Sequence, residues 1–200
     1  MNYFVTAIGT DCGKTISSAI LCHALGADYW KPIQAGFPKD SDTVKSLVPD
    51  VKIHPEAFTL KTPASPHAAP KIDKVQIELK SIQKPVTQNN LIIEGAGGCL
   101  VPVNNREFVI DLYEHIPCKI ILVANLYLGS INHTLLTVNL LKQRNYSVKG
   151  IIFNGEPNAE SEEIILRHAG YLPLLHVLPE KEINHNTIVK YSEILKNQWR

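Results

Sequence analysis

Short apolar runs alternate with segments of helical pattern from one end of the chain to the other. The apolar runs lack in/out alternation, which is typical of strands covered by helices on both faces. We interpret these runs as strands: Tyr3–Ile8, Asp28–Trp30, Leu91–Ile93, Lys119–Ala124, Val148–Phe153 and the weaker Leu172–Leu178. The helical candidates are Ser17–Leu25, Ser41–Leu47, Lys74–Ile82, Phe108–His115, Ile131–Gln143 and Glu160–His168. This order predicts an α/β fold with a doubly wound, mostly parallel sheet and helices on both faces.

The segment 32–85 is less regular and holds eight of the chain's 13 prolines. No repeat, low-complexity tract or linker divides the 200 residues. We therefore expect residues 1–200 to form one domain.

Charge and composition exclude several classes of function. The formal net charge is +1, and the four arginines are scattered, so we expect no nucleic-acid partner and no basic membrane patch. No apolar run approaches the roughly 20 residues of a membrane-spanning helix, and Met1–Val5 does not resemble a signal peptide. The four cysteines form no C-x-x-C pair and the eight histidines no H-x-x-x-H pair. We expect a cytoplasmic protein without a histidine metal site.

The stretch AIGTDCGKT, residues 7–15, connects the first predicted strand to the first predicted helix. A phosphate-binding loop reads G-x-x-x-x-G-K-[ST], but Ile8 stands at the first glycine position and Gly9 follows one residue later. In a working loop, backbone N–H groups and the helix N-terminus bind phosphate oxygens. Lys14 would contact the β- and γ-phosphates, and the Thr15 hydroxyl would bind Mg²⁺. The alternative is a glycine-containing turn with an incidental lysine, but the order strand, turn, GKT and helix favours the nucleotide loop.

The stretch LIIEGAGG, residues 91–98, ends a buried strand in a carboxylate and a glycine-rich turn. Glu94, in the same sheet as a phosphate loop, would hold Mg²⁺ directly or through water. Gly95, Gly97 and Gly98 would let the backbone approach a ligand closely. Taken alone, such an acid is more often a solvated strand end, so the metal role depends on the neighbouring loop.

Two motifs carry charges whose role the residues alone leave open. In WKPIQAG, Lys31 ends the second short strand, which we place beside the first strand. It is either an exposed lysine or a second cation near the γ-phosphate or an anionic substrate. In KDSDTV, Asp40 and Asp42 are candidates to cap the helix that follows.

Two predicted helix N-termini carry further candidates. In LYLGSINHTLLT, the segment 129–132 would direct free backbone N–H groups at a carboxylate. The alternative is that Ser130 caps the helix, and the two roles are compatible. Cys12 lies inside the phosphate loop at a helix N-terminus, where we expect a lowered thiol pKa.

In this order, the features resemble dethiobiotin synthetase, the ATP-dependent enzyme of biotin synthesis, which has a P-loop NTPase fold. The family's loop has the layout T-x-x-x-T-x-x-GKT with its early small residue at Ala7, so the late Gly9 fits a working loop. KPxxxG, EGAGG and GxINH together are more specific than any phosphate-loop match. The matching stretches, from Phe4 to Glu180, are FVTAIGTDCGKT, YWKPIQAG, DSDTV, SPHAAP, IIEGAGGCLVP, LGSINHTLLT, GIIFNGEP and PLLHVLPE.

The resemblance implies ATP-dependent carboxylation and ring closure of 7,8-diaminononanoate with CO2, giving dethiobiotin, ADP and phosphate. One amine forms a carbamate, whose oxygen attacks the γ-phosphate of ATP to give a carbamic-phosphoric anhydride. The second amine then closes the ureido ring and expels phosphate. Catalysis of such a phosphoryl transfer is mainly positioning and charge neutralisation.

The resemblance also implies roles for residues. Lys14 would stabilise the transferring phosphate, Lys31 would hold carbamate and γ-phosphate together, and Asn154 would recognise adenine. Mg²⁺ would be bound by Thr15, Asp42 and Glu94. The residues expected to contact ATP and its Mg²⁺ are Asp11, Cys12, Gly13, Lys14, Thr15, Ile16, Asp42, Glu94, Gly95, Ala96, Gly97, Asn154, Gly155, Leu178, Pro179 and Glu180.

The family is homodimeric, with the substrate carboxylate at the dimer interface. The residues expected to bind substrate are Lys31, Ala35, Gly129, Ser130, Ile131 and Asn132, of which the last four would serve the neighbouring subunit. The chain departs from the family at Ala35, where some members carry a hydroxyl that contacts substrate. His67, in SPHAAP, matches the family pattern but has no assigned role.

The main alternative is a P-loop switch ATPase that uses nucleotide to control a protein partner. Loops of that class resemble K-G-G-x-G-K-T, and their signature lysine would fall at position 9, where the chain has glycine. A small-molecule kinase with an arginine-rich lid is disfavoured by the four scattered arginines.

Overall fold

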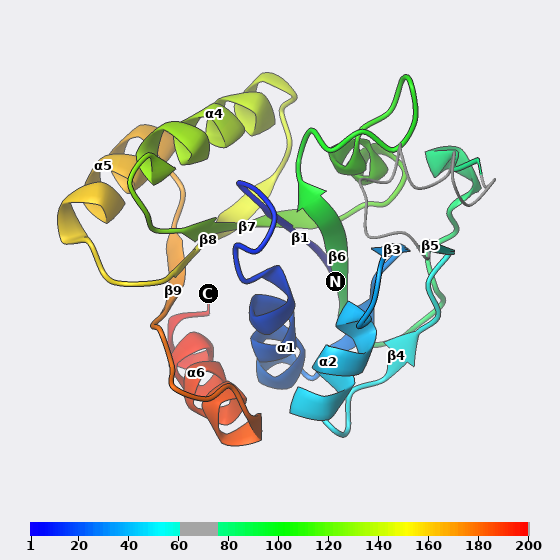
Figure 1. Ribbon diagram of the computed structural model, residues 1–200, viewed down its shortest axis with the longest axis horizontal. Coiled ribbons are helices and arrows are strands. Elements are labelled where there is room, and N and C mark those ends of the chain that lie inside the picture. Colours follow the sequence, from blue (N-terminus) through cyan, green and yellow to red (C-terminus); the bar gives the residue numbers. More distant parts are fainter. Residues whose placement is uncertain (61–75, 200) are drawn as a thin grey trace.

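A parallel sheet of seven strands lies at the centre of the computed structural model, which describes residues 1–60 and 76–199 (Figure 1). The strand order is β4-β2-β6-β1-β7-β8-β9, and every neighbouring pair runs parallel. The strands are β1 (Asn2–Ala7), β2 (Asp28–Trp30), β4 (Ile53–His54), β6 (Leu91–Gly98), β7 (Lys119–Asn125), β8 (Val148–Asn154) and β9 (Pro173–Val177). A separate parallel pair joins β3 (Ile33–Ala35) to β5 (Phe58–Leu60).

Helices lie on both faces of this sheet, which confirms the predicted fold class (Figure 1). One face carries α1 (Lys14–Leu25), α2 (Asp40–Leu47) and α6 (His185–Gln198), and the other carries α4 (Ser130–Gln143) and α5 (Ala159–Ala169). Two short 3₁₀ helices are η1 (Leu79–Ser81) and η2 (Val109–Glu114). Within the described residues, no helix is long and apolar enough to cross a membrane.

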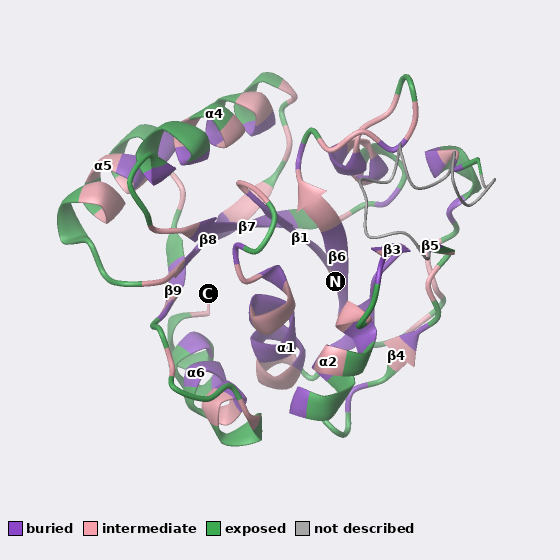
Figure 2. Cartoon of the chain, in the orientation of Figure 1, coloured by how far each residue is buried: buried purple, intermediate pink, exposed green. Residues whose placement is uncertain are grey.

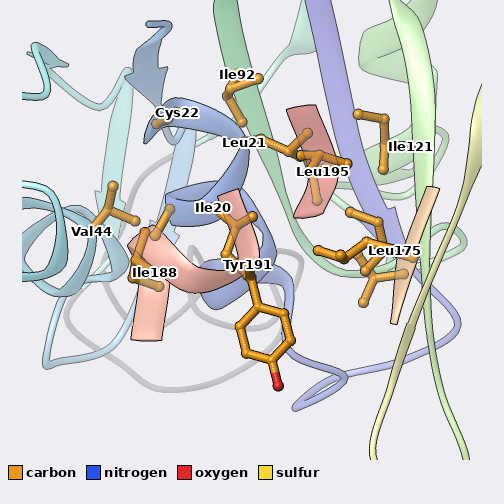
Figure 3. Packing of buried hydrophobic residues seen from close by; sticks show 14 of the residues in the cluster. Ile20, Leu21, Cys22, Val44, Ile92, Ile121, Leu175, Ile188, Tyr191 and Leu195 are labelled. Atoms are coloured by element: carbon orange, nitrogen blue, oxygen red, sulfur yellow. The ribbon is translucent and has the colours of Figure 1, made fainter. Parts of the chain in front are cut away.

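The burial of the strands explains their continuous apolar sequences. β1 and β7 each contain five consecutive buried residues, so both faces of these strands are covered. On the face of α1, Ile20 and Leu21 pack in one cluster with Ile121 of β7 and with Tyr191 and Leu195 of α6 (Figure 3). The inner strands are buried and the outward sides of the helices are exposed (Figure 2).

The structure differs from four predictions about elements. β2 lies beside β6 and not beside β1, because β6 inserts between them and pairs with both. β6 continues through EGAGG to Gly98, so the expected glycine-rich turn is part of a strand. The predicted helix Phe108–His115 is the shorter 3₁₀ helix η2, and the predicted helix Lys74–Ile82 is described only from residue 76, where it contains the single turn η1.

Helix α6 and three short strands were not predicted from the sequence. Helix α6 carries Ile188, Tyr191 and Leu195 at helical spacing, and the Asn184 side chain caps its N-terminus. This signal was present in the sequence. Strands β3, β4 and β5 contain only two or three residues each, too few to show any period.

Asp28 begins β2 at the end of the sheet opposite the phosphate loop. Its buried carboxylate accepts hydrogen bonds from His54 Nε2 at 2.8 Å, Thr87 Oγ1 at 2.7 Å and Asn89 Nδ2 at 2.9 Å. These bonds attach the edge strand β4 and the segment before β6 to β2. Burial raises the pKa of Asp28, but the hydrogen bonds from Asn89, Thr87 and His54 outweigh it, so the pKa lies below its ordinary value.

We expect Asp28→Asn to lower the free energy of unfolding by about 2 kcal/mol at pH 7, because an amide leaves buried donors unsatisfied. The folded-state pKa is depressed, so this stabilisation is present above the unfolded-state pKa of about 3.9 and is lost as pH falls through the folded-state value. Urea unfolding of both proteins at pH 7 and near pH 3 measures the effect. The difference should shrink in acid, and an equal difference at both pH values would contradict the role of the charge.

Candidate active site

The phosphate loop connects the end of β1 to the start of α1 at the carboxyl edge of the sheet. Gly13 is the N-cap of α1 with a φ of 90°, and no side chain caps this helix. Asp11 also has a positive φ, of 55°, a conformation that Asp tolerates better than most residues. The loop therefore leaves the N–H groups of the helix N-terminus free of side-chain caps, as anion binding requires.

Lys14 lies largely buried beside this loop. Its Nζ donates to the Gly9 carbonyl oxygen at 3.0 Å. Burial lowers the pKa of Lys14, and the nearby charge of Lys31 lowers it further against the opposing effect of Glu94.

Three oxygen atoms meet next to the loop. Thr15 Oγ1 lies 3.0 Å from Glu94 Oε1 and 3.0 Å from Asp40 Oδ1. Asp42, the metal ligand that the resemblance implies, is exposed and does not line the cavity. Asp40 and Asp42 are two residues apart on the first turn of α2 and so point in different directions. The structure therefore brings Asp40, and not Asp42, to Thr15 and Glu94.

Lys31 follows β2 and is buried, so the interpretation as an exposed strand-end lysine is wrong. Its Nζ lies 2.7 Å from Asp40 Oδ2 and 3.0 Å from Glu94 Oε1, and it donates to the Gly95 carbonyl oxygen at 3.1 Å. Burial lowers the pKa of Lys31, but the attraction of Glu94 and Asp40 outweighs it and raises the pKa. Lys31 is therefore a charged amine inside the site.

Two buried residues that the sequence analysis did not single out support these groups. Tyr29 Oη donates to Glu94 Oε2 at 3.0 Å, and burial, together with the charge of Glu94, raises the pKa of this phenol well above its ordinary value. Gln34 Oε1 accepts from the backbone N–H of Asp40 at 3.1 Å, and Gln34 Nε2 donates to the Gly36 carbonyl oxygen at 3.2 Å. Both residues lie in the stretch YWKPIQAG, but their roles depend on contacts with Glu94 and α2 that the sequence does not show.

A cavity of about 670 Å³ joins the loop to the carboxylates and to Lys31. Residues of the predicted site that line it are Asp11, Gly13, Lys14, Thr15, Ile16, Lys31, Ala35, Glu94, Ala96 and Gly97. Phe37 and Asp40 also line it and were not predicted as site residues.

Cys12 lies in the loop but does not line this cavity. Burial raises the pKa of its thiol, and the nearby Lys14 offsets this only in part. The expected lowering of the pKa by the helix N-terminus is therefore wrong, because the thiol is 3% exposed and its Sγ donates to the Thr10 carbonyl oxygen at 3.4 Å.

The residues expected near adenine lie at the ends of β8 and β9, outside the lining of the cavity. Asn154 Nδ2 donates to the Cys12 carbonyl oxygen at 3.1 Å, so this side chain is in contact with the phosphate loop. Gly155 pairs through its N–H with Val177, and the segment 178–180 follows β9. The Glu180 carboxylate accepts from Tyr191 Oη at 2.6 Å.

The segment 129–132 lies at a second cavity, of about 370 Å³, lined by 126–131, 156–158 and Ser161. Gly129, with a φ of 104°, is the N-cap of α4, and no side chain caps this helix, so the expected capping by Ser130 is wrong. Asn132 is exposed and does not line this cavity. The structure does not bring these residues to Lys31 within one chain. His67 lies outside the described residues.

A parallel sheet with the loop GKT between β1 and α1, and with Glu94 beside it, defines the protein as a P-loop NTPase. The family model described as "AAA domain" matches residues 1–186. The chain is 55% identical over 201 residues to the ATP-dependent dethiobiotin synthetase of Cytophaga hutchinsonii, covering 98% of each chain. It is 45% identical to that of Chlamydia pneumoniae, covering 98% of this chain and 89% of the relative. The chain belongs to the family of ATP-dependent dethiobiotin synthetases.

Solved structures of low sequence identity share the fold. The cell division ATPase MinD of Pyrococcus furiosus is 12% identical with a TM-score of 0.61, and the alignment covers 98% of each chain. A ParA family ATPase of Chlorobium tepidum is 13% identical with a TM-score of 0.55, covering 98% of this chain and 95% of that one. At such identity the likeness concerns the fold alone.

Proposed function

We propose that the protein uses ATP and CO2 to convert 7,8-diaminononanoate into dethiobiotin, ADP and phosphate. The observation that carries this proposal is that Lys31 Nζ and Thr15 Oγ1 both lie 3.0 Å from Glu94 Oε1 beside the phosphate loop, in a chain whose relatives are dethiobiotin synthetases. The cavity of about 670 Å³ that contains them has room for phosphates and a small substrate. The four free cysteines fit a reducing compartment such as the cytoplasm.

In this proposal the carbamate of one amine attacks the γ-phosphate, and the other amine then attacks the carbamic-phosphoric anhydride and expels phosphate. Lys31 holds the carbamate oxygen and the γ-phosphate together, and Lys14 neutralises charge on the transferring phosphate. The N–H groups at the start of α1 bind phosphate oxygens. Fixed charges of this kind stabilise the transition state without reorganisation.

The cluster of oxygen atoms fits Mg²⁺. The Thr15 hydroxyl and the carboxylates of Glu94 and Asp40 are hard donors, and their small number leaves positions for water and phosphate, as Mg²⁺ prefers. Bound there, Mg²⁺ would neutralise charge on the β- and γ-phosphates. The resemblance implies Asp42 for the second carboxylate, whereas the distances support Asp40.

The two aspartates are distinguished by substitution. We expect Asp40→Asn to raise the Mg²⁺ concentration for half-maximal turnover by about 10-fold or more, and the matched Asp42→Asn to change it by less than about twofold. Turnover at fixed ATP over a Mg²⁺ titration measures both. The reverse order would return the metal role to Asp42 and would mean that α2 turns when nucleotide binds.

We also propose a homodimer in which the segment 129–132 serves the neighbouring subunit's site. Leu128 is fully exposed and Tyr127 is 46% exposed at the second cavity, so this surface presents apolar side chains next to the uncapped N-terminus of α4. Such an N-terminus favours a carboxylate, and the substrate carries one. A second copy of the chain would cover the apolar side chains.

We expect Leu128→Asp to make the protein monomeric and to raise the KM for the diamine by about 10-fold, because a charge opposes burial at an interface. Light scattering coupled to size-exclusion chromatography gives the mass. Leu172→Asp is the control, since Leu172 is 59% exposed, directly precedes β9 and does not line the second cavity. A dimeric Leu128→Asp protein with unchanged KM would refute the interface.

A further inference from the structure

Tyr29 contacts the Glu94 carboxylate from the neighbouring strand. It is fully buried on β2 and pairs in register with Ile92 of β6. Glu94 lies two residues beyond Ile92, so its side chain is on the same face of β6. An aromatic side chain can span such a diagonal, and Tyr29 Oη donates to Glu94 Oε2 at 3.0 Å.

The two oxygen atoms of Glu94 have different partners. Oε1 lies 3.0 Å from Thr15 Oγ1 and 3.0 Å from Lys31 Nζ, on the side of the cavity. Within the described part of the chain, Oε2 is hydrogen-bonded to Tyr29. The carboxylate is 1% exposed, so water contributes little to orienting it. The phenol therefore fixes which oxygen faces the cavity.

We propose that Tyr29 is a positioning residue of the metal site, which holds Glu94 so that Oε1 alone is offered to the divalent cation. This inference rests on the proposed function, in which Glu94 binds Mg²⁺. Because Oε2 is hydrogen-bonded to the Tyr29 hydroxyl and Oε1 faces the cavity, Glu94 would bind the cation through one oxygen. Single-oxygen binding suits the octahedral preference of Mg²⁺, whereas Ca²⁺ accepts two-oxygen carboxylates and more ligands. Tyr29 therefore contributes both metal affinity and selectivity for Mg²⁺ over Ca²⁺.

The test measures binding of metal rather than turnover. Mn²⁺ binding to the protein with ADP is followed by the electron paramagnetic resonance signal of free Mn²⁺, and Mg²⁺ and Ca²⁺ are measured by displacement. The variants are Tyr29→Phe, Glu94→Gln and their double variant. Tyr3→Phe is the matched control, because Tyr3 is a buried tyrosine of the same core cluster that does not contact Glu94. Melting temperatures without metal show that each variant is folded.

We expect Tyr29→Phe to weaken Mg²⁺ binding about 10- to 100-fold, which is the range for outer-shell partners of metal ligands, and to weaken Ca²⁺ binding less. We expect Tyr3→Phe to bind both ions like the wild type. In the Glu94→Gln background, adding Tyr29→Phe should not lower the metal affinity further, since Tyr29 acts through Glu94.

The possible failures are distinguishable. If Glu94→Gln loses metal and Tyr29→Phe does not, the role of Tyr29 is overturned while the proposed metal site stands. The role of Tyr29 is also overturned if Tyr29→Phe and Tyr3→Phe lose metal affinity equally, or if Tyr29→Phe loses affinity for Mg²⁺ and Ca²⁺ equally. A generally weakened core would produce either result. If Glu94→Gln itself binds metal normally, Glu94 is not a ligand, and both proposals fall.

Discussion

Replacing Lys31 with alanine is expected to lower turnover about 1,000-fold while the affinity for ATP changes only a few-fold. The ammonium lies 3.0 Å from Glu94 Oε1 in the cavity that the phosphate loop lines. In the proposed reaction it contacts the oxygen that attacks and the phosphate that is attacked, where charge develops. Removing one such donor from a water-poor site costs about 100- to 1,000-fold in rate, and Lys31 carries a full charge.

The measurement is single-turnover formation of ADP and ring product at saturating diamine, together with binding of a non-hydrolysable ATP analogue. Lys52→Ala is the control, because Lys52 directly precedes β4, is exposed, lies 3.8 Å from Asp28 and does not line the cavity. Melting temperatures with Mg²⁺ present show whether Glu94 and Asp40 tolerate the loss of their cation. Turnover of a folded Lys31→Ala protein within about 10-fold of wild type would remove Lys31 from the mechanism.

The second large effect is expected at Gly13, where alanine should weaken nucleotide binding by about 100-fold or more. A Cβ there would lie 2.4 Å from Asn154 Nδ2, and the φ of 90° disfavours a side chain. Either the loop or the Asn154 side chain, which donates to the Cys12 carbonyl oxygen, must then shift. Backbone strain of about 1–3 kcal/mol adds to the cost. Calorimetric titration with MgADP measures the affinity.

Gly26→Ala is the control for backbone strain alone. Gly26 ends the same helix with a φ of 56°, and nothing lies within 4 Å of its Cβ position. We expect this variant to lose about 1 kcal/mol of stability and to bind MgADP like the wild type. If Gly13→Ala bound MgADP as tightly as Gly26→Ala, the loop would not be the phosphate site.

The sequence allowed the fold class and the centre of the site to be predicted because both depend on local order. β1, the GKT loop and α1 are consecutive, so Lys14 and Thr15 are placed by a single turn of chain. Glu94 could be placed beside them because the carboxyl ends of parallel strands share one edge of the sheet. The spacing of Asp40 and Asp42, by contrast, did not show which of them faces Thr15, since this depends on how α2 is rotated.

The residues that escaped prediction act across the sheet. Tyr29 looks like an ordinary strand residue until β6 is known to lie beside β2, and we had placed β2 beside β1. For Cys12 we expected a lowered thiol pKa from its position at a helix N-terminus, but burial raises the pKa of this thiol. Neighbours in space and desolvation are set by the tertiary structure, which a pattern along the chain does not record.

The fold by itself does not separate the synthetase from a switch ATPase. Solved structures of MinD and of a ParA family ATPase share the fold with this chain at 11–14% identity. The local difference is at position 9, where the switch class would carry lysine and this chain has Gly9. A Cβ added at Gly9 would lie 3.6 Å from Cys12 Sγ. The distinction therefore depends on chemistry in the cavity, which can be measured directly.

The most direct test of the account is product formation by the purified protein from 7,8-diaminononanoate, bicarbonate and MgATP. Mass spectrometry detects the cyclic urea, and ADP is counted in the same reaction. We predict cyclic urea and ADP in equal amounts, with both depending on the diamine. ADP release without urea, unchanged when the diamine is omitted, would contradict the synthetase and indicate an ATPase that acts on a protein partner.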